Sequence, residues 1–289
     1  MEQVIINGLY LGAQYALIAL GLTLIFSLMN VLNFAHGQMY VLGGFVVYQL
    51  YGQAGMPFVF ALIVSGITLA VVGAIIERYL FRTVIRRSVR EESTMLLAAG
   101  IAFFLDAVIL LAFGEKQRGV PKLVDGVFNW DFRIIMPYDR ILVGVLAISA
   151  IISFVAYMQY SKPGRAMRAL AQDRVAAQLM GVNVEFYSMV GFSMGAMLAG
   201  VVGGLLVTIT GVNSGIGGAI SIKAFLMVMI GGAGVISGAI AGGFILGMME
   251  SVGLTVLRSY GDITYLVIFA SLMVFLVIRP NGLMGKPWG

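Results

Sequence analysis

The sequence predicts an all-α fold, a polytopic transmembrane helical bundle of about eight spans in a single domain covering residues 1–289. Hydrophobic residues make up 60% of the chain, and charged residues make up 11%, less than half the roughly 25% of a soluble domain. The mean hydropathy is +1.00. The apolar residues also gather in runs close to the ~20 residues that cross a bilayer. A soluble protein is therefore excluded.

Eight apolar segments follow one another along the chain and are the expected spans. They cover residues 4–29, 37–50, 57–76, 94–113, 139–160, 186–211, 221–249 and 262–278. These segments leave no room for a soluble catalytic domain, and the chain has no Cys for a disulfide or a thiolate metal site. We therefore expect no enzyme, no cofactor and no metal. The net charge of +5 comes from cations in short loops, which set topology and do not indicate nucleic acid.

Two basic connections orient the spans. Five arginines lie from Arg78 to Arg90, and four cations lie from Lys162 to Arg174. Cytoplasmic loops are enriched in Lys and Arg, so both connections are expected in the cytoplasm. The connection 114–138 mixes charges of both signs and fits the opposite side, as a small strand-and-turn cap.

Two breaks in the apolar pattern predict broken or re-entrant helices, near residues 30–38 and 230–234. A cytoplasmic C-terminus, favoured by Arg279 and Lys286, needs segment 221–249 to return to its starting side or to break into two pieces at the second site. An unbroken span would place the tail outside. The sequence leaves both open.

Polar and glycine residues at these breaks are candidates for a translocation path, because free backbone and polar groups at membrane depth tend to face a cavity. The candidates, with one carboxylate inside a span, are Asn30, Asn33, His36, Gln38, Asp106, Gly231, Gly232 and Gly234. The first break could equally be a polar turn in which the chain's single His bonds to backbone.

The intramembrane charges have two interpretations each. The carboxylate of Asp106 could relay protons or could be a hydrogen-bonded group that packs two helices, and we favour packing. Lys223, just inside the seventh segment, could extend to the interface or hold an acidic neighbour.

The segment 161–185 is too polar to span, and its composition predicts a helix over about 165–181 that ends at a glycine. This cytoplasmic helix could lie on membrane lipid or insert into a partner's groove, and small alanines favour a close protein contact. The candidate residues for coupling to such a partner protein are Arg165, Arg168, Asp173, Ala176, Ala177 and Gly181.

Several sequence runs, in order, resemble one family across almost the whole chain. They are NGLYLGAQYALIALGLTLIF, NFAHGQMYVLG, SKPGRAMRALAQDRVAAQLMGVN, KAFLMVMIGGAGVISGAIAGGFILGMME and RPNGLMG. Each is weak alone, but together they are specific. The chain resembles the LivH-type permeases of the high-affinity branched-chain amino acid ABC transporters. The third run is similar to the cytoplasmic EAA---G loop of ABC importers, which is the segment that couples to the ATPases.

The resemblance implies a permease that forms the translocation path for branched-chain or related amino acids in the bacterial cytoplasmic (inner) membrane. It implies a LivM-like second permease, two ATPase subunits that hydrolyse ATP, and a periplasmic substrate-binding protein. Two departures, Val235 in place of a small polar residue and Asp106 in place of an amide, could reflect another substrate. Urea, amides and aromatic acids are alternatives within the family.

Two other classes remain as alternatives. An ion-coupled secondary transporter or channel would use Asp106 or Lys223 as a charge relay, but it would not need a helical cytoplasmic docking segment. An intramembrane enzyme would need clustered catalytic groups, and the only His stands without acidic neighbours in the sequence.

Overall fold

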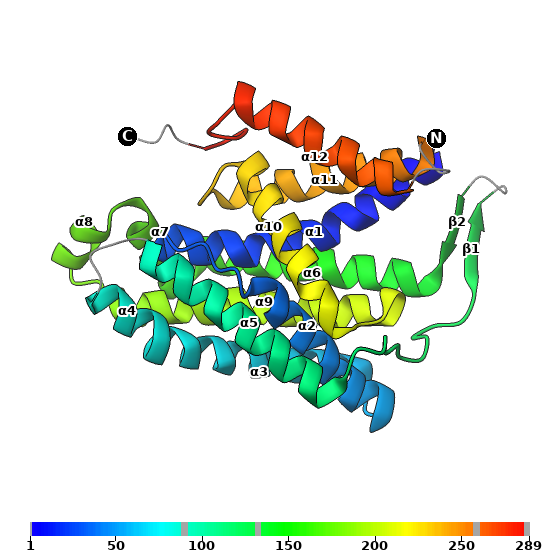
Figure 1. Cartoon of the computed structure of the whole chain (residues 1–289), viewed down its shortest axis with the longest axis horizontal. Coiled ribbons are helices and arrows are strands. Elements are labelled where there is room, and N and C mark those ends of the chain that lie inside the picture. Colours follow the sequence, from blue (N-terminus) through cyan, green and yellow to red (C-terminus); the bar gives the residue numbers. More distant parts are fainter. Residues whose placement is uncertain (1, 88–91, 131–133, 257–260, 286–289) are drawn as a thin grey trace.

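A long buried helix, α1 (Glu2–Met29), forms the middle of the bundle, and helices α6, α9, α10 and α11 pack around it (Figure 1). The computed structural model describes residues 2–87, 92–130, 134–256 and 261–285. Apolar residues lie all round α1, as expected for a helix that is buried on every side.

The remaining elements follow the apolar segments of the sequence. The first half contains α2 (His36–Val47) with a π-helical turn (Tyr48–Gln53), α3 (Phe58–Ile75), a second π-helical turn (Ile76–Phe81), α4 (Arg82–Arg87), α5 (Glu92–Phe113), and the strands β1 (Val127–Trp130) and β2 (Ile134–Pro137). The second half contains α6 (Tyr138–Tyr160), α7 (Lys162–Gln172), α8 (Arg174–Leu179), α9 (Val184–Thr210), a 3₁₀ turn (Ser214–Ile216), α10 (Gly217–Gly231), α11 (Ile236–Val256) and α12 (Gly261–Ile278).

Seven of the described helices are long and apolar enough to cross a membrane. The prediction of a polytopic helical bundle is therefore confirmed, and the chain is a multi-pass membrane protein. Segment 221–249 does not form one span: it falls into α10 and α11, which are separated by residues 232–235. The expected break at the first site is also present, because residues 30–35 are not helical.

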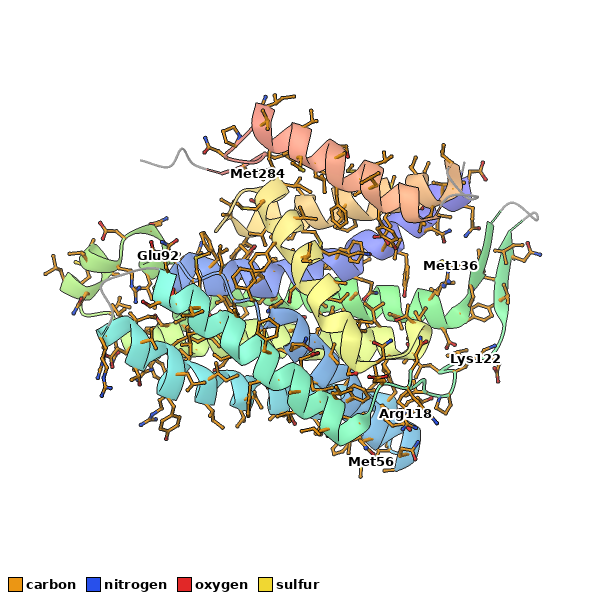
Figure 2. The ribbon with its side chains drawn as sticks, in the orientation of Figure 1. Met56, Glu92, Arg118, Lys122, Met136 and Met284 are labelled. Carbon is orange, nitrogen blue, oxygen red and sulfur yellow. The ribbon has the colours of Figure 1, made fainter. Side chains whose placement is uncertain are left out.

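The two ends of the bundle differ in what they carry. Helices α4, α7 and α8 lie at one end, together with the end of α12, whereas the N-terminus and the antiparallel β1–β2 hairpin lie at the other (Figure 1). Glu92 lies toward the first end, and Arg118 and Lys122 lie toward the second (Figure 2). The two basic segments that were predicted to be cytoplasmic thus lie at the same end of the bundle, and α12 also ends there. Arg90 and Lys286 lie outside the described residues.

Glycines allow the buried helices to touch through their backbones. A Cβ at Gly247 of α11 would collide with the backbone of Gly12 on α1, and one at Gly43 of α2 would collide with the backbone of Gly200 on α9. Such small-residue contacts bring membrane helices closer than larger side chains permit. Many of the glycines are thus packing positions.

The outer helices expose large apolar side chains. On α5, Leu111 is 87% exposed, and Leu96 and Phe103 are also turned outward. A water-soluble protein rarely exposes such a continuous apolar face, whereas lipid tails solvate it at no cost. The exposed faces therefore match the hydrocarbon region of a membrane.

Candidate functional site

The break between α1 and α2 is built by two asparagines. Asn30 adopts a positive φ of 53° and ends α1, with its backbone N–H still bonded to the carbonyl of Phe26. The side chain of Asn33, fully buried, accepts a hydrogen bond of 3.1 Å from the backbone N–H of Ala35. Asparagine tolerates the left-handed region and caps turns with its side chain, so the local sequence explains the break.

His36 stands at the first position of α2 and is fully buried. Its Nε2 lies 3.1 Å from the carbonyl oxygen of Ile18 on α1, and its ring lies against Gly21. No group of three or more His, Cys, Asp or Glu that could hold a metal occurs among the described residues. The contact with the Ile18 carbonyl is the backbone hydrogen bond of the polar-turn interpretation, and it joins the start of α2 to α1.

Gln38 and Asp106, two of the path candidates, are far apart in the sequence, and the fold brings them together. The Gln38 Nε2 donates to Asp106 Oδ1 at 3.0 Å and so joins α2 to α5. The other end of the Gln38 amide, Oε1, is buried without a hydrogen-bond partner and lies against Gly217 of α10.

The start of α10 closes the same junction from another side. Gly37 donates its backbone N–H to Ser221 Oγ at 3.0 Å, and that hydroxyl donates to the carbonyl of Phe34 at 2.9 Å. The first turns of α2 and α10 therefore meet α5 at one polar junction, which we call the Gln38–Asp106 junction. It contains only two of the eight predicted path residues.

The glycines of the second break have different surroundings. Gly231 packs against the backbone of Gly238, and Gly232, with φ of 105°, lies against Gly285 of the C-terminal segment. Backbone bonds of 2.8 Å and 3.0 Å from Leu283 and Met284 to the last carbonyls of α10 hold that segment in place. These two glycines therefore pack within the chain.

The predicted coupling helix is two helices. The Asp173 side chain accepts bonds of 2.8 and 2.9 Å from the N–H groups of Val175 and Ala176 and thereby caps α8, while its own extended backbone ends α7. Gly181, with φ of 84°, ends the segment as predicted. An Asp inside a helical run is a start signal for a helix, and it could have indicated the division.

The alanines of this segment differ in exposure. Ala176 is exposed, but Ala177 is only 5% exposed and packs within the chain. Of the two alanines expected to favour a close contact with a partner, only Ala176 is therefore accessible on the surface. Arg165 and Arg168 are exposed and donate to the carbonyls of Tyr160 and Gln159, at 2.9 and 3.1 Å, at the end of α6.

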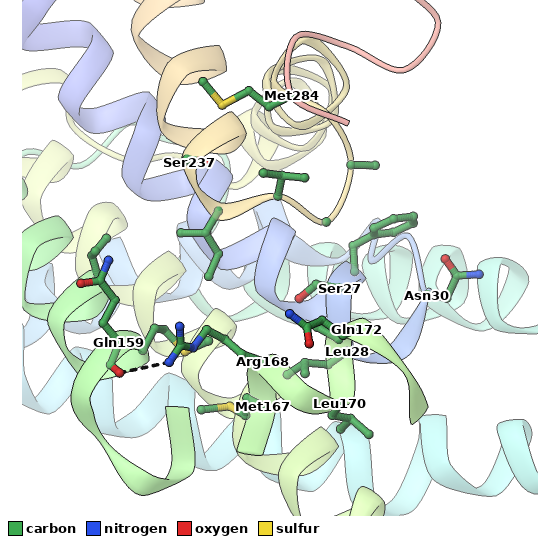
Figure 3. Close-up of a pocket in the computed structure, with 18 of the residues that line it drawn as sticks. Ser27, Leu28, Asn30, Gln159, Met167, Arg168, Leu170, Gln172, Ser237 and Met284 are labelled. Carbon is green, nitrogen blue, oxygen red and sulfur yellow. Dashed lines mark hydrogen bonds between the residues drawn. The ribbon is translucent and has the colours of Figure 1, made fainter. Parts of the chain in front are cut away.

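A cavity of about 880 Å³ lies between the end of α1, helices α6 and α7, the 232–235 turn and the start of α11 (Figure 3). Its lining includes Asn30 and Gly234 from the predicted path set and Arg168 from the predicted coupling set. The structure therefore joins residues of the two predicted sets in one space.

A buried charged cluster was not anticipated as a unit. Lys223 Nζ lies 3.0 Å from both carboxylate oxygens of Glu250 and 2.8 Å from the hydroxyl of Tyr15, and Tyr265 donates to the same carboxylate at 2.9 Å. Lys223 thus holds an acidic neighbour, the second of its two interpretations. Glu250 was missed, although a carboxylate inside an apolar run was the signal used for Asp106.

The sequence is similar to those of named transport proteins. The chain is 32% identical, over 99% of its length and 96% of the relative's, to the high-affinity branched-chain amino acid transport system permease protein BraD of Pseudomonas aeruginosa. The LivH protein of Escherichia coli, with the same description, gives the same identity and coverage. A probable branched-chain amino acid transport permease protein LivH of Methanocaldococcus jannaschii is 29% identical, over 99% of this chain and 94% of that protein.

The fold also resembles a solved structure. PsaBC from Streptococcus pneumoniae, in complex with Fab, superposes with a TM-score of 0.52 over 95% of this chain and 91% of that chain, at 16% identity, which supports the fold alone. The family model described as the permease component of the branched-chain amino acid transport system matches residues 4–277. With this match and 32% identity along nearly the whole chain, the protein belongs to the family of branched-chain amino acid transport permeases.

Proposed function

We propose that this chain is one of two permease subunits of an ABC importer in the bacterial cytoplasmic (inner) membrane and carries branched-chain amino acids. A LivM-like second permease completes the path, a periplasmic binding protein delivers the amino acid, and two ATPase subunits hydrolyse ATP. The names of the relatives support the substrate class, since all three denote branched-chain amino acid transport. The chain has no phosphate-binding loop of its own, so ATP must be hydrolysed elsewhere.

The observation that carries the proposal is the shared lining of the 880 Å³ cavity. Asn30 lies at the end of α1, and Arg168 lies on α7 (Figure 3). Gly234 lies in the 232–235 turn before α11. A coupling helix that forms one wall of the path can change the shape of that path when an ATPase moves it. We place the Gln38–Asp106 junction, where α2, α5 and α10 meet, on the same proposed path.

Helix α8 supports docking to a partner. Leu179 is 83% exposed, and Val175 and Met180 are exposed beside it, although this segment lies at the basic end of the bundle. Three large apolar side chains on a surface helix outside the spans indicate a protein contact. The ATPase is the partner that the family's architecture requires at the cytoplasmic end.

Co-purification of the ATPase tests this assignment. We expect Leu179→Asp to leave the permease in the membrane but to reduce ATPase recovery at least tenfold, because a buried unpaired charge disfavours docking by several kcal/mol. Gln178→Asp, on the same helix and also exposed, is the matched control and should retain the ATPase. Full recovery with Leu179→Asp, or amino acid uptake that survives removal of the ATPases, would contradict the proposal.

The orientation can be tested separately in the naturally Cys-free chain. A single Cys at Arg168 on α7 should react with a membrane-impermeant maleimide only from the cytoplasmic side. A single Cys at Asp125, before the hairpin, should react only from the periplasmic side. Labelling of both from one side would overturn the assignment of the basic end to the cytoplasm.

A further inference from the structure

The 880 Å³ cavity has the size and the composition of a small-molecule site, since such sites enclose roughly 300–1,000 Å³ with mostly apolar walls and a few polar groups. One wall is α7, and the opposite wall is the start of α11 with the turn before it (Figure 3). Apolar side chains from α6, α7 and α11, namely Met158, Met167, Leu170 and Ile240, form much of the lining.

The charges at the cavity are all positive. Arg168 and Arg174 are the charged side chains of its lining, and no acidic side chain lines it among the described residues. Arg168 is exposed, donates from Nη2 to the backbone carbonyl of Gln159, and forms no ion pair in the described part of the chain. A guanidinium has five N–H donors, so Arg168 keeps most of them for a ligand.

The opposite wall also favours an anion. Ile236 and Ser237, the first residues of the 21-residue helix α11, line the cavity. The first N–H groups of a helix lack intrahelical acceptors, and their dipoles attract negative charge. A carboxylate between Arg168 and this helix start would be stabilised from two sides, while an aliphatic group would contact the Met and Leu side chains. The α-ammonium of an amino acid would need acceptors, and the amide oxygens of Asn30 and Gln172 are available in the same lining.

We propose that this cavity binds the transported amino acid from the cytoplasmic side, with Arg168 pairing to its α-carboxylate, and that this binding slows further uptake. The inference rests on the proposed function, in which α7–α8 couples to the ATPase. A bound amino acid would connect α7 to α11 across the cavity. A ligand that prefers one arrangement of these two walls shifts the transporter toward that arrangement, which makes the product an inhibitor.

The test uses the complete transporter in proteoliposomes, with ATP and the ATPases inside. The initial rate of L-leucine uptake is measured in vesicles loaded with unlabelled L-leucine and in empty vesicles, and the ratio of the two rates is compared among variants. Internal L-leucine should slow the wild type. Arg168→Ala should raise the half-inhibitory concentration about tenfold or more, because a charge-assisted bond is lost. Lys162→Ala, which also removes a cation from α7 but at an exposed position outside the cavity lining, should keep the wild-type ratio.

A direct binding measurement separates this inference from the proposed function. L-leucine is titrated into the permease–ATPase complex in lipid nanodiscs, without the binding protein, and L-leucinol serves as the analogue that lacks the carboxylate. We expect binding of L-leucine that weakens at least tenfold in Arg168→Ala but not in Lys162→Ala, and no binding of L-leucinol. Equal binding by wild type and Arg168→Ala, or equal inhibition ratios, would overturn the inference. Absence of any ATP-driven uptake in empty wild-type vesicles would contradict the proposed function instead, and the titration would still decide whether the cavity binds.

Discussion

Removal of one charge from the buried Lys223–Glu250 pair should destabilise the bundle strongly. The two side chains are 19% and 7% exposed, and Lys223 Nζ lies 3.0 Å from both carboxylate oxygens. In Glu250→Gln, the ammonium keeps the Tyr15 hydroxyl but loses its counter-charge and faces an amide. Breaking a buried pair typically costs 3–5 kcal/mol, and because Lys223 is partly exposed we expect about 3 kcal/mol, roughly a hundredfold in the folding equilibrium.

The double variant distinguishes this explanation from simple loss of packing. Lys223→Met alone leaves the carboxylate unpaired and should also cost about 3 kcal/mol. The double variant Lys223→Met with Glu250→Gln leaves no net charge in the cluster. Its free energy of unfolding should therefore fall by about 3 kcal/mol or less, whereas two independent sites would together lose about 6 kcal/mol. Unfolding in mixed dodecyl maltoside–SDS micelles, followed by circular dichroism, measures each loss.

Additive losses in the double variant, or single losses below about 1 kcal/mol, would refute the reasoning. The exposed pair between Arg86 and Glu185, at the basic end, provides the comparison. We expect Glu185→Gln to leave the unfolding midpoint unchanged, because exposed ion pairs contribute little.

Two further predictions concern the junction and the helix packing. Asp106→Asn should retain at least half of the uptake rate, because the new amide oxygen still accepts the Gln38 N–H. The difference between a charged and a neutral hydrogen bond is only about 1 kcal/mol. Complete loss of uptake at normal expression would instead favour a charge relay. Gly43→Val should abolish the monodisperse peak in detergent size-exclusion chromatography, since its Cβ meets the backbone of Gly200, whereas Gly218→Ala, which meets open space, should elute as wild type.

The spans could be predicted from the sequence because the signal is local. Each apolar run must satisfy its own backbone hydrogen bonds inside lipid, and helix formation achieves this without a partner. The first break was equally local, since Asn30 and Asn33 disfavour a continuous helix and supply the turn themselves. The end of segment 161–185 at Gly181 was local for the same kind of reason, because glycine readily adopts positive φ.

The partners of the polar groups could not be predicted in this way. Gln38 and Asp106 are 68 positions apart, and Lys223 and Glu250 are 27 apart, so no local pattern pairs them. Each was visible as a polar residue in an apolar run, which indicates only that it must face something other than lipid. Which group it faces depends on how α2, α5, α10 and α11 pack.

What the sequence alone determined was therefore the membrane-spanning class, the approximate position of most spans, the breaks and the basic segment 161–185. Only the tertiary structure decided that Ala177 is buried while Ala176 is exposed, and that Asn30, Arg168 and Gly234 line one cavity. The physical reason lies in the range of the interactions. Hydrophobic runs, turns and caps act over a few residues, whereas cavities and buried charge pairs arise where distant helices meet, at distances set by the glycines between them.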